Sequence, residues 1–300
     1  MGDPAFVVPL ENVAVKYSLS YEDVPVEILD PQDGIMLSQR KYAEYLPTQA
    51  RLSDQKVAHT PMEINVMYKN DDGDPLAEPT LYRRLIGCLI YLTITRPDIS
   101  YPVQVLSQFV TNPCQHHFSS LLRIILYVQS TINRGLFFHS TSSLNLEGYT
   151  DADWAGCPNS RKSTTGWCML IISSLISWKC KKQPRISKSS TEVEYRSMSA
   201  ACSEIVWIYR LMAELHISVD GSTTLHADNT SAIQIATNSV HHETTKHIKV
   251  DCQYIQEHVV DQVISIRDIM SHDQLADLFT KVMTRSRHQF LLSKLMLLDK

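Results

Sequence analysis

Hydrophobic and polar positions alternate differently in the two halves of the chain, and the first half indicates a short hairpin followed by helices. Two strand-like runs, residues 24–29 and 34–37, flank a turn rich in Pro, Asp and Gly, and a helix is predicted to start at Ser38. Residues 68–80 concentrate Asp, Asn, Gly and Pro and therefore predict a linker or long loop. Apolar residues then recur at helical spacing in three stretches, which predict three packed helices: residues 81–94, 101–111 and 116–130.

From residue 144 onward the pattern changes to short strands. The strands predict a three-stranded meander over residues 144–153, 165–172 and 175–180. A long helix follows, because apolar side chains repeat every three or four residues over 193–215, and Thr191 and Glu194 have the spacing of a capping box. A strand, two helices, a strand and a closing helix complete the chain at residues 222–228, 229–238, 250–260, 263–269 and 273–284. The order βββαβααβα predicts an α/β fold.

Length and composition are those of an ordinary globular protein. Three hundred residues favour about two domains. The hydrophobic share of 44% and the charged share of 20% exclude wholesale disorder and a fibrous protein. Seven scattered cysteines without a CxxC pair indicate free thiols rather than a disulfide framework or a zinc knuckle.

No segment has the properties of a membrane span or a signal peptide. The longest uncharged apolar run, residues 85–95, is well short of the roughly 20 residues that cross a bilayer. No basic residue precedes Lys16, and Phe6 stands where a myristoylation motif requires Ser or Thr. We therefore expect an intracellular protein, cytoplasmic or nuclear, that is not secreted and has no membrane partner.

Two groups of histidines suggest zinc at first sight. Cys114, His116 and His117 form one group, and His241 and His242 form the other. Neither has a second ligand pair at finger spacing, so a structural role is the better interpretation.

Three acidic residues stand where strands and helix starts would bring them together, and a fourth lies on the predicted closing helix. Asp151 ends the first strand of the meander, Glu194 lies in the first turn of the long helix, Asp228 ends the strand 222–228, and Asp277 lies on the closing helix. Carboxylates that crowd together repel one another, so such a cluster persists when divalent cations neutralise it. An all-oxygen site favours magnesium or manganese, and two such ions can drive phosphodiester hydrolysis.

A purely structural interpretation of these carboxylates competes with the metal site. Strands often end in Asp, and Glu194 has the position of a capping residue. Asp153 and Glu192 are close enough to be confused with the candidates. We prefer Asp151 because alternation along a strand places it on the same face as Tyr149.

A basic segment lies beside these carboxylates in the sequence. It contains no acidic residue and holds Lys179, Lys181, Lys182, Arg185 and Lys188. In a chain with net charge −4, this segment is a local candidate for binding nucleic-acid phosphates. The alternative is a solvated strand edge that lysines protect from aggregation.

Many short motifs stand in collinear order along the chain: SQRKY (38–42), TPM (60–62), YRRLIG (82–87), YLTITRPDIS (91–100), YTDADWAG (149–156), RKSTTG (161–166), ISWKCKKQ (176–183), SSTEVEYRSMS (189–199), HADN (226–229), TKHI (245–248) and QLADLFTK (274–281). Together they resemble the C-terminal part of a copia-type retrotransposon Pol polyprotein. The resemblance covers nearly the whole chain from about residue 24.

The resemblance implies a division into four parts. Residues 1–23 are unassigned, 24–140 derive from the palm end, thumb and connection of a reverse transcriptase, 144–285 form a ribonuclease H domain, and 286–300 form a C-terminal tail. The implied ribonuclease H fold is a mixed five-stranded sheet with flanking helices, preceded by a mainly helical remnant.

The resemblance also implies roles for the four acidic residues. By their motifs, the catalytic carboxylates of the family correspond to Asp151, Glu194, Asp228 and Asp277. These carboxylates are expected to hold two magnesium ions, with manganese as an alternative, and Asp151 is expected to bridge both ions. The implied substrate is RNA in an RNA·DNA hybrid or another duplex, and His272 has a position that suits product release.

Departures from the family pattern limit the expected activity. The metal-binding YVDD turn of the polymerase is absent, so we expect no polymerase activity. After TKHI, Lys249 and Asp251 stand where the family has an acidic and then a basic residue. Two rival interpretations stay open: a module that holds nucleic acid without cutting it, and a non-functional relic.

Overall fold

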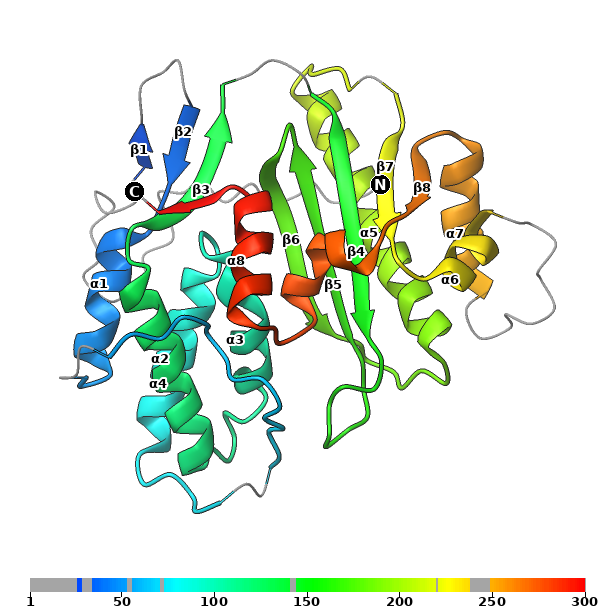
Figure 1. The fold of residues 1–300 in the computed structure, drawn as a ribbon. Helices are drawn as coiled ribbons and strands as arrows, with labels where there is room; N and C mark the ends of the chain where they lie inside the picture. The colour runs from blue at the N-terminus through cyan, green and yellow to red at the C-terminus, as the bar shows by residue number, and fades with distance from the viewer. Residues whose placement is uncertain are drawn as a thin grey trace, which may run out of the picture.

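The computed structural model of the chain describes residues 26–28, 34–52, 56–70, 73–140, 144–219, 221–237 and 249–299 (Figure 1). Its first part joins a four-stranded antiparallel sheet in the order β1-β2-β3-β9 to a group of helices. The strands are β1 (Val26–Ile28), β2 (Gly34–Leu37), β3 (Arg134–His139) and β9 (Leu297–Asp299). The helices are α1 (Arg40–Gln49), α2 (Pro79–Leu92), α3 (Ser100–Ser107) and α4 (Gln115–Ser130), with a 3₁₀ turn at Pro97–Ile99.

The second part is a five-stranded mixed sheet in the order β6-β5-β4-β7-β8. The strands are β4 (Leu146–Asp153), β5 (Thr164–Ile171), β6 (Ser174–Lys182), β7 (Thr223–Ala227) and β8 (Ile264–Asp268). Antiparallel pairing joins β4, β5 and β6, whereas β7 is parallel to both β4 and β8. One face of this sheet is covered by α5 (Ser190–Glu214), α6 (Thr230–Thr237) and α7 (Lys249–Val260). Two 3₁₀ turns, Ser271–Asp273 and Leu275–Phe279, precede α8 (Arg285–Lys294). The predicted α/β fold with a mixed five-stranded sheet is confirmed.

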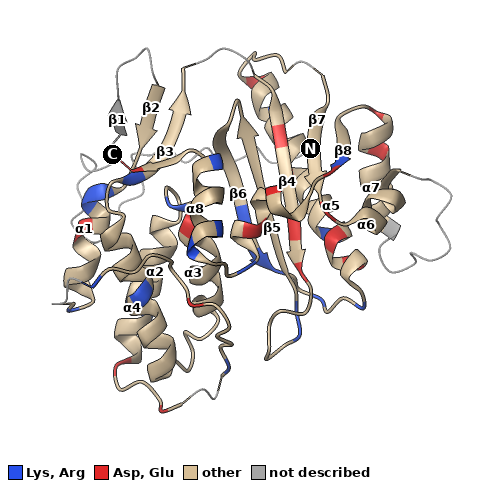
Figure 2. Cartoon of the chain, viewed as in Figure 1, with Lys and Arg blue, Asp and Glu red and all other residues tan. Residues whose placement is uncertain are grey.

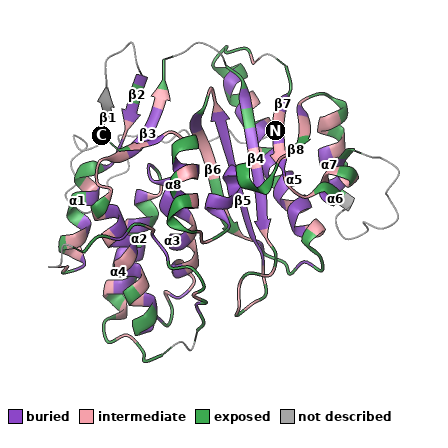
Figure 3. Cartoon of the chain, in the orientation of Figure 1, coloured by how far each residue is buried: buried purple, intermediate pink, exposed green. Residues whose placement is uncertain are grey.

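Burial on both faces explains the sequence of β5 (Figure 3). Trp167 and Met169 belong to the core shared with α5, whereas Cys168 and Leu170 belong to the core shared with α8. Because successive side chains of a strand point to opposite faces, a strand covered on both sides is apolar throughout. This second sheet is therefore the middle layer of three.

The closing helix predicted over 273–284 is wrong. A short 3₁₀ turn covers Leu275–Phe279, and α8 begins only at Arg285, where the Thr284 hydroxyl accepts a hydrogen bond from the Arg287 N–H. Helical geometry ends at Thr280, whose hydroxyl donates a hydrogen bond to the carboxylate of Asp151 on β4. Contacts of Thr280 and Lys281 with Asp151, rather than helix propensity, position the segment that follows the 3₁₀ turn.

Within the segment 286–300, predicted as a tail, the described residues 286–299 form most of α8 and all of β9. Strand β9 pairs with β3 of the first sheet, and Arg134 forms an ion pair with Asp299. The hydrophobic pattern also contained no indication of β3.

The division into domains stays a prediction. Within the described part of the chain, no helix has the length and apolar character of a membrane span.

Candidate active site

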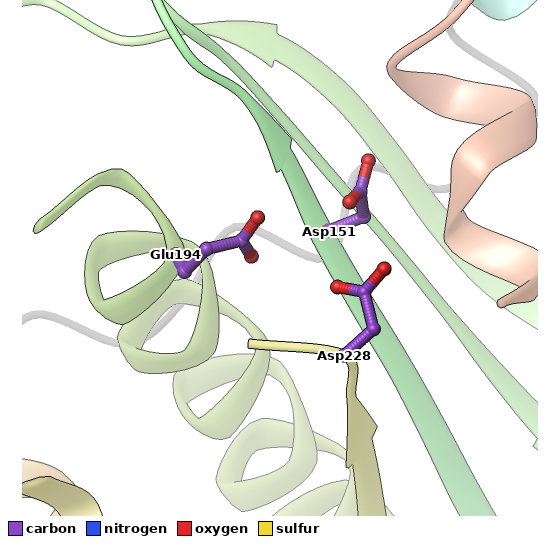
Figure 4. A group of neighbouring side chains, drawn as sticks. All are labelled: Asp151, Glu194 and Asp228. Carbon is purple, nitrogen blue, oxygen red and sulfur yellow. The ribbon is translucent and has the colours of Figure 1, made fainter. Parts of the chain in front are cut away.

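Three carboxylates from separate elements converge at one edge of the five-stranded sheet (Figure 4). Asp151 comes from β4, Glu194 from the first turns of α5, and Asp228 directly follows β7. One oxygen of each carboxylate lies within 4.8 Å of the others. Parallel pairing of β4 with β7 is what brings the ends of these two strands to the same edge.

Helix α5 approaches β4 closely through small polar side chains. The Ser197 hydroxyl donates to the backbone carbonyl oxygen of Asp151 at 2.8 Å and accepts a hydrogen bond from the Thr150 hydroxyl at 2.7 Å. The backbone N–H of Ala152 donates to Glu194 Oε1 at 3.3 Å. These bonds fix the glutamate side chain against the strand that carries Asp151.

The helix cap lies elsewhere, so the capping interpretation of Glu194 is wrong. The Ser189 hydroxyl accepts from the N–H of Glu192, and Glu192 in turn accepts from the N–H of Lys188 at 2.7 Å. Glu192 also forms an ion pair with Arg196. With the cap supplied by these residues, Glu194 is left to face the other two carboxylates.

The electrostatics of the group disfavour three ionised carboxylates in the absence of a cation. Burial, and then the neighbouring Asp151 and Asp228 carboxylates, raise the pKa of Glu194. Burial also raises the pKa of Asp151, although Lys281 opposes the shift. Glu194 Oε2 is buried without a hydrogen-bond partner among the described residues. An orphaned carboxylate oxygen beside two others fits Mg²⁺ or Mn²⁺, which take oxygen ligands.

The fourth predicted carboxylate, Asp277, lies next to this group but is neutralised differently. Lys281 Nζ lies 2.7 Å from Asp277 Oδ1 and 3.1 Å from Asp151 Oδ1. Arg287 Nη2 lies 3.1 Å from the other oxygen of Asp277. The turn that carries Asp277 can approach because Gly166 is opposite Asp151: a Cβ there would lie 2.6 Å from Thr280 Cγ2.

Sequence reasoning missed three residues around Asp277: Thr280, Lys281 and Arg287. A signal was available for two of them, since Thr280 and Lys281 belong to the QLADLFTK motif and Asp277 and Lys281 have the i, i+4 spacing of an ion pair. Arg287 carried no such signal because its contact depends on where α8 begins. His272 is exposed, and its Nδ1 lies 3.2 Å from Asp273 Oδ1 rather than at the carboxylate group.

Figure 2 marks Lys and Arg positions in blue, including those along β6, and the structure divides the basic segment into two sets by the exposure of its side chains. Lys179 and Lys181 on the edge strand β6 are exposed, as are Arg185 and Lys188 in the following loop. Lys182 is instead engaged within the protein, with Nζ 2.6 Å from Gln108 Oε1 of α3 and 2.8 Å from Cys157 Sγ. Four of the five predicted residues are therefore available to a ligand at this edge.

An exposed indole ring lies against the basic loop, three residues after Asp151 in the sequence. Trp154 follows β4 directly and is 51% exposed, yet its Nε1–H donates to the backbone oxygen of Ser187 at 3.3 Å. The ring is thus fixed at its polar edge while half of its surface faces solvent.

The zinc alternatives find no support in the described residues. Cys114 Sγ lies 3.2 Å from His117 Nδ1, and the His117 ring stacks on Phe109 in the helical core. The only group of three metal-suitable side chains in the described ranges is Asp151, Glu194 and Asp228. His241 and His242 lie outside the described residues.

The chain is similar to curated retroelement proteins over most of its length. It is 36% identical over 291 residues to the Retrovirus-related Pol polyprotein from transposon RE1 of Arabidopsis thaliana, which covers 95% of this chain and 20% of that protein. It is 37% identical to the corresponding polyprotein from transposon RE2, over 85% of this chain and 18% of that protein. The chain thus spans about a fifth of the length of these relatives.

A shorter relative is covered more fully. An uncharacterised mitochondrial protein of Arabidopsis thaliana is 40% identical over 182 residues, which are 61% of this chain and 75% of that protein. No protein-family model matches the chain.

Solved structures give weaker likenesses. LC11-RNase H1 in complex with an RNA/DNA hybrid matches 45% of this chain and 94% of its own, with 13% identity and a TM-score of 0.36. The foamy viral protease-reverse transcriptase in complex with double-stranded DNA matches 79% of this chain and 36% of its own, with 11% identity and a TM-score of 0.42.

Proposed function

Because the chain belongs to the copia-type family of retrovirus-related Pol polyproteins, we propose that residues 144–285 are a ribonuclease H domain that hydrolyses RNA in RNA·DNA hybrids. The observation that carries the proposal is the convergence of Asp151, Glu194 and Asp228 at one sheet edge. Crowded, partly buried carboxylates cost free energy unless a cation neutralises them, so their presence favours a metal-dependent reaction.

Asp151, Glu194 and Asp228 would hold the divalent ions, and Asp277 would complete the set for a second ion. Two such ions supply an activated water and stabilise the leaving oxygen of a phosphodiester. The protein's own contribution is positioning: Ser197 holds α5 against β4, and the Ala152 N–H aims the Glu194 carboxylate. Asp151 has an oxygen within 4.8 Å of Glu194 and Asp228 and shares the Lys281 ammonium with Asp277, so it would serve both ions.

The surface that binds the substrate would extend from the carboxylates to the edge strand β6 and the loop that follows it. Lys179, Lys181, Arg185 and Lys188 would contact the phosphate backbone without reading sequence. The exposed Trp154 ring, anchored on Ser187, would pack against a sugar or base beside the scissile phosphate. Residues 24–140, the reverse transcriptase remnant, would supply no polymerase chemistry because the carboxylate turn of a polymerase palm is absent from the sequence.

The direct test measures release of labelled RNA from a hybrid by the purified full chain in Mg²⁺, Mn²⁺ and Ca²⁺. We expect cleavage in the first two ions and little in Ca²⁺, whose looser and longer coordination places the reacting oxygens poorly. A folded protein, verified by circular dichroism, that binds the hybrid but is inactive in Mg²⁺ and Mn²⁺ would favour the non-cutting module instead.

A further inference from the structure

The ammonium group of Lys281 lies between two acidic side chains of the candidate site. Its Nζ is 3.1 Å from Asp151 Oδ1 and 2.7 Å from Asp277 Oδ1, so one positive charge is shared by both carboxylates. Elsewhere in the site, no described lysine or arginine forms an ion pair with Glu194 or Asp228. The cation-free side of Asp151 therefore faces Glu194 and Asp228, and the opposite side is already neutralised.

Asp277 does not depend on Lys281 for its orientation. Arg287 Nη2 holds the second carboxylate oxygen of Asp277 at 3.1 Å, and the same nitrogen donates to the backbone oxygen of Ser271 at 2.8 Å. Lys281 can leave while Asp277 stays in place, since the lysine side chain is 42% exposed and its four-carbon stem is flexible.

We propose that Lys281 is a place-holder for a divalent ion. Given the ribonuclease H function proposed above, the substrate-free protein takes up one ion, on Asp151, Glu194 and Asp228. The Lys281 ammonium lies between Asp151 and Asp277 and keeps a second ion from binding there, because an ammonium and a divalent cation in the same gap would repel each other. A substrate phosphate offers the ammonium a new anionic partner and so opens the gap.

This arrangement has a structural advantage for a chain without bound ions. Asp151 and Asp277 face each other, and each would raise the free energy of the folded state if neither were neutralised. Lys281 removes that repulsion in the absence of substrate. Lys281 is thus a positioning residue for the metal site and not a catalytic one.

Isothermal titration calorimetry with Mn²⁺ alone, without substrate, tests the stoichiometry. We expect one ion per chain for the wild type and for Lys281→Arg, and two for Lys281→Met, with the affinity for the second ion raised by about tenfold or more. Lys294→Met is the matched control: this exposed lysine of α8 lies over the Phe290 ring and should leave the stoichiometry at one.

Thermal unfolding gives a second readout that does not depend on activity. In EDTA, Lys281→Met should melt at a lower temperature than the wild type, because Asp151 and Asp277 lose their shared cation. Saturating Mn²⁺ should then raise its melting temperature by more than it raises that of the wild type. If Lys281→Met fails to fold in EDTA, Lys281→Gln takes its place in both experiments.

Two ions bound by the wild type, or one ion bound with unchanged affinity by Lys281→Met, would overturn the place-holder role. The proposed function stands or falls separately. Two ions in a wild type that cleaves hybrids would remove the place-holder and keep the nuclease, whereas the expected stoichiometries without any cleavage would keep the place-holder and remove the nuclease.

Discussion

Ser197 donates its hydroxyl hydrogen to the backbone carbonyl oxygen of Asp151, so the helix that carries Glu194 is bonded directly to the strand that carries the first aspartate. The same hydroxyl accepts from Thr150, and both side chains are fully buried. A larger side chain at this position would separate α5 from β4, and an apolar one of equal size would leave the Thr150 hydroxyl without its partner.

We therefore expect Ser197→Ala to lower the free energy of unfolding by about 1–3 kcal/mol, the cost of leaving a buried polar group unpaired. It should also weaken Mn²⁺ binding, since Glu194 lies one helical turn away. Ser203→Ala on the same helix removes only a bond to the Ser199 carbonyl and is the control. Equal effects of the two variants in urea denaturation and calorimetry would contradict this role.

Asp151→Asn should reduce RNA cleavage by orders of magnitude while hybrid binding is largely retained. The substitution keeps the shape of the side chain but removes a charge that faces the other carboxylates. Asp153→Asn and Glu192→Gln should have far smaller effects, because Asp153 is outside the group and Glu192 is engaged with Arg196. Loss of cleavage in Asp153→Asn, with Asp151→Asn fully active, would show that the site is assigned to the wrong residues.

Replacing both Lys179 and Lys181 with Gln should weaken hybrid binding similarly for all sequences. It should also reduce the slope of log affinity against log salt by up to about 0.9 for each phosphate that the protein no longer neutralises. Lys182→Gln should leave this slope unchanged, because its ammonium is engaged by Gln108 and Cys157. Fluorescence anisotropy across a salt series measures all three proteins, and an unchanged slope in the double variant would return these lysines to a solvated strand edge.

Trp154→Ala should weaken hybrid binding by about 1–3 kcal/mol, the range found for aromatic side chains that stack on nucleic-acid bases. Trp154→Phe should recover part of the loss. Trp207 provides a matched control, since it is 54% exposed on the same helix as Glu194 but roughly 20 Å farther along the helix axis. If Trp207→Ala weakens binding as much as Trp154→Ala does, the effect is not specific to the site.

His288 should make the fold sensitive to acid. Burial lowers the pKa of this histidine from 6.5 to about 4, and its ring packs edge-on against Tyr127. Between these two pKa values the unfolded chain binds more protons than the folded one, so stability is complete above pH 6.5 and is lost as the pH falls toward 4. The loss should reach up to about 3 kcal/mol.

Urea denaturation at about pH 7.5 and about pH 4.5, on either side of the unperturbed histidine pKa, measures this dependence. The difference between the two pH values should be smaller in His288→Met than in the wild type, and His59→Gln, at an exposed position, should leave it unchanged. The same difference in His288→Met as in the wild type would assign the acid sensitivity to other groups.

Local pattern predicted much of the fold, whereas the choice of Asp151 and Glu194 over Asp153 and Glu192 also needed the family resemblance. Helical spacing located α2, α4 and α5, because each of these helices buries a continuous apolar face of its own. Short strand-like runs separated by turn residues located β4, β5 and β6. The short strand β9 was not predictable in this way, since three residues become a strand only by pairing with β3. The short 3₁₀ turn at Asp277 was not predicted for a related reason, because its contacts are to residues far away in the sequence, such as the hydrogen bond from Thr280 to Asp151.

During synthesis on a ribosome, the four-stranded sheet is completed last although it contains the earliest strands. Its edge at β3 waits for β9, whose Leu297 pairs with Leu136. Until those residues emerge, β3 presents an unpaired edge, and the core beneath α8 lacks Leu291 and Leu295. The nascent chain is therefore exposed to aggregation at this edge until α8 and β9 have been synthesised.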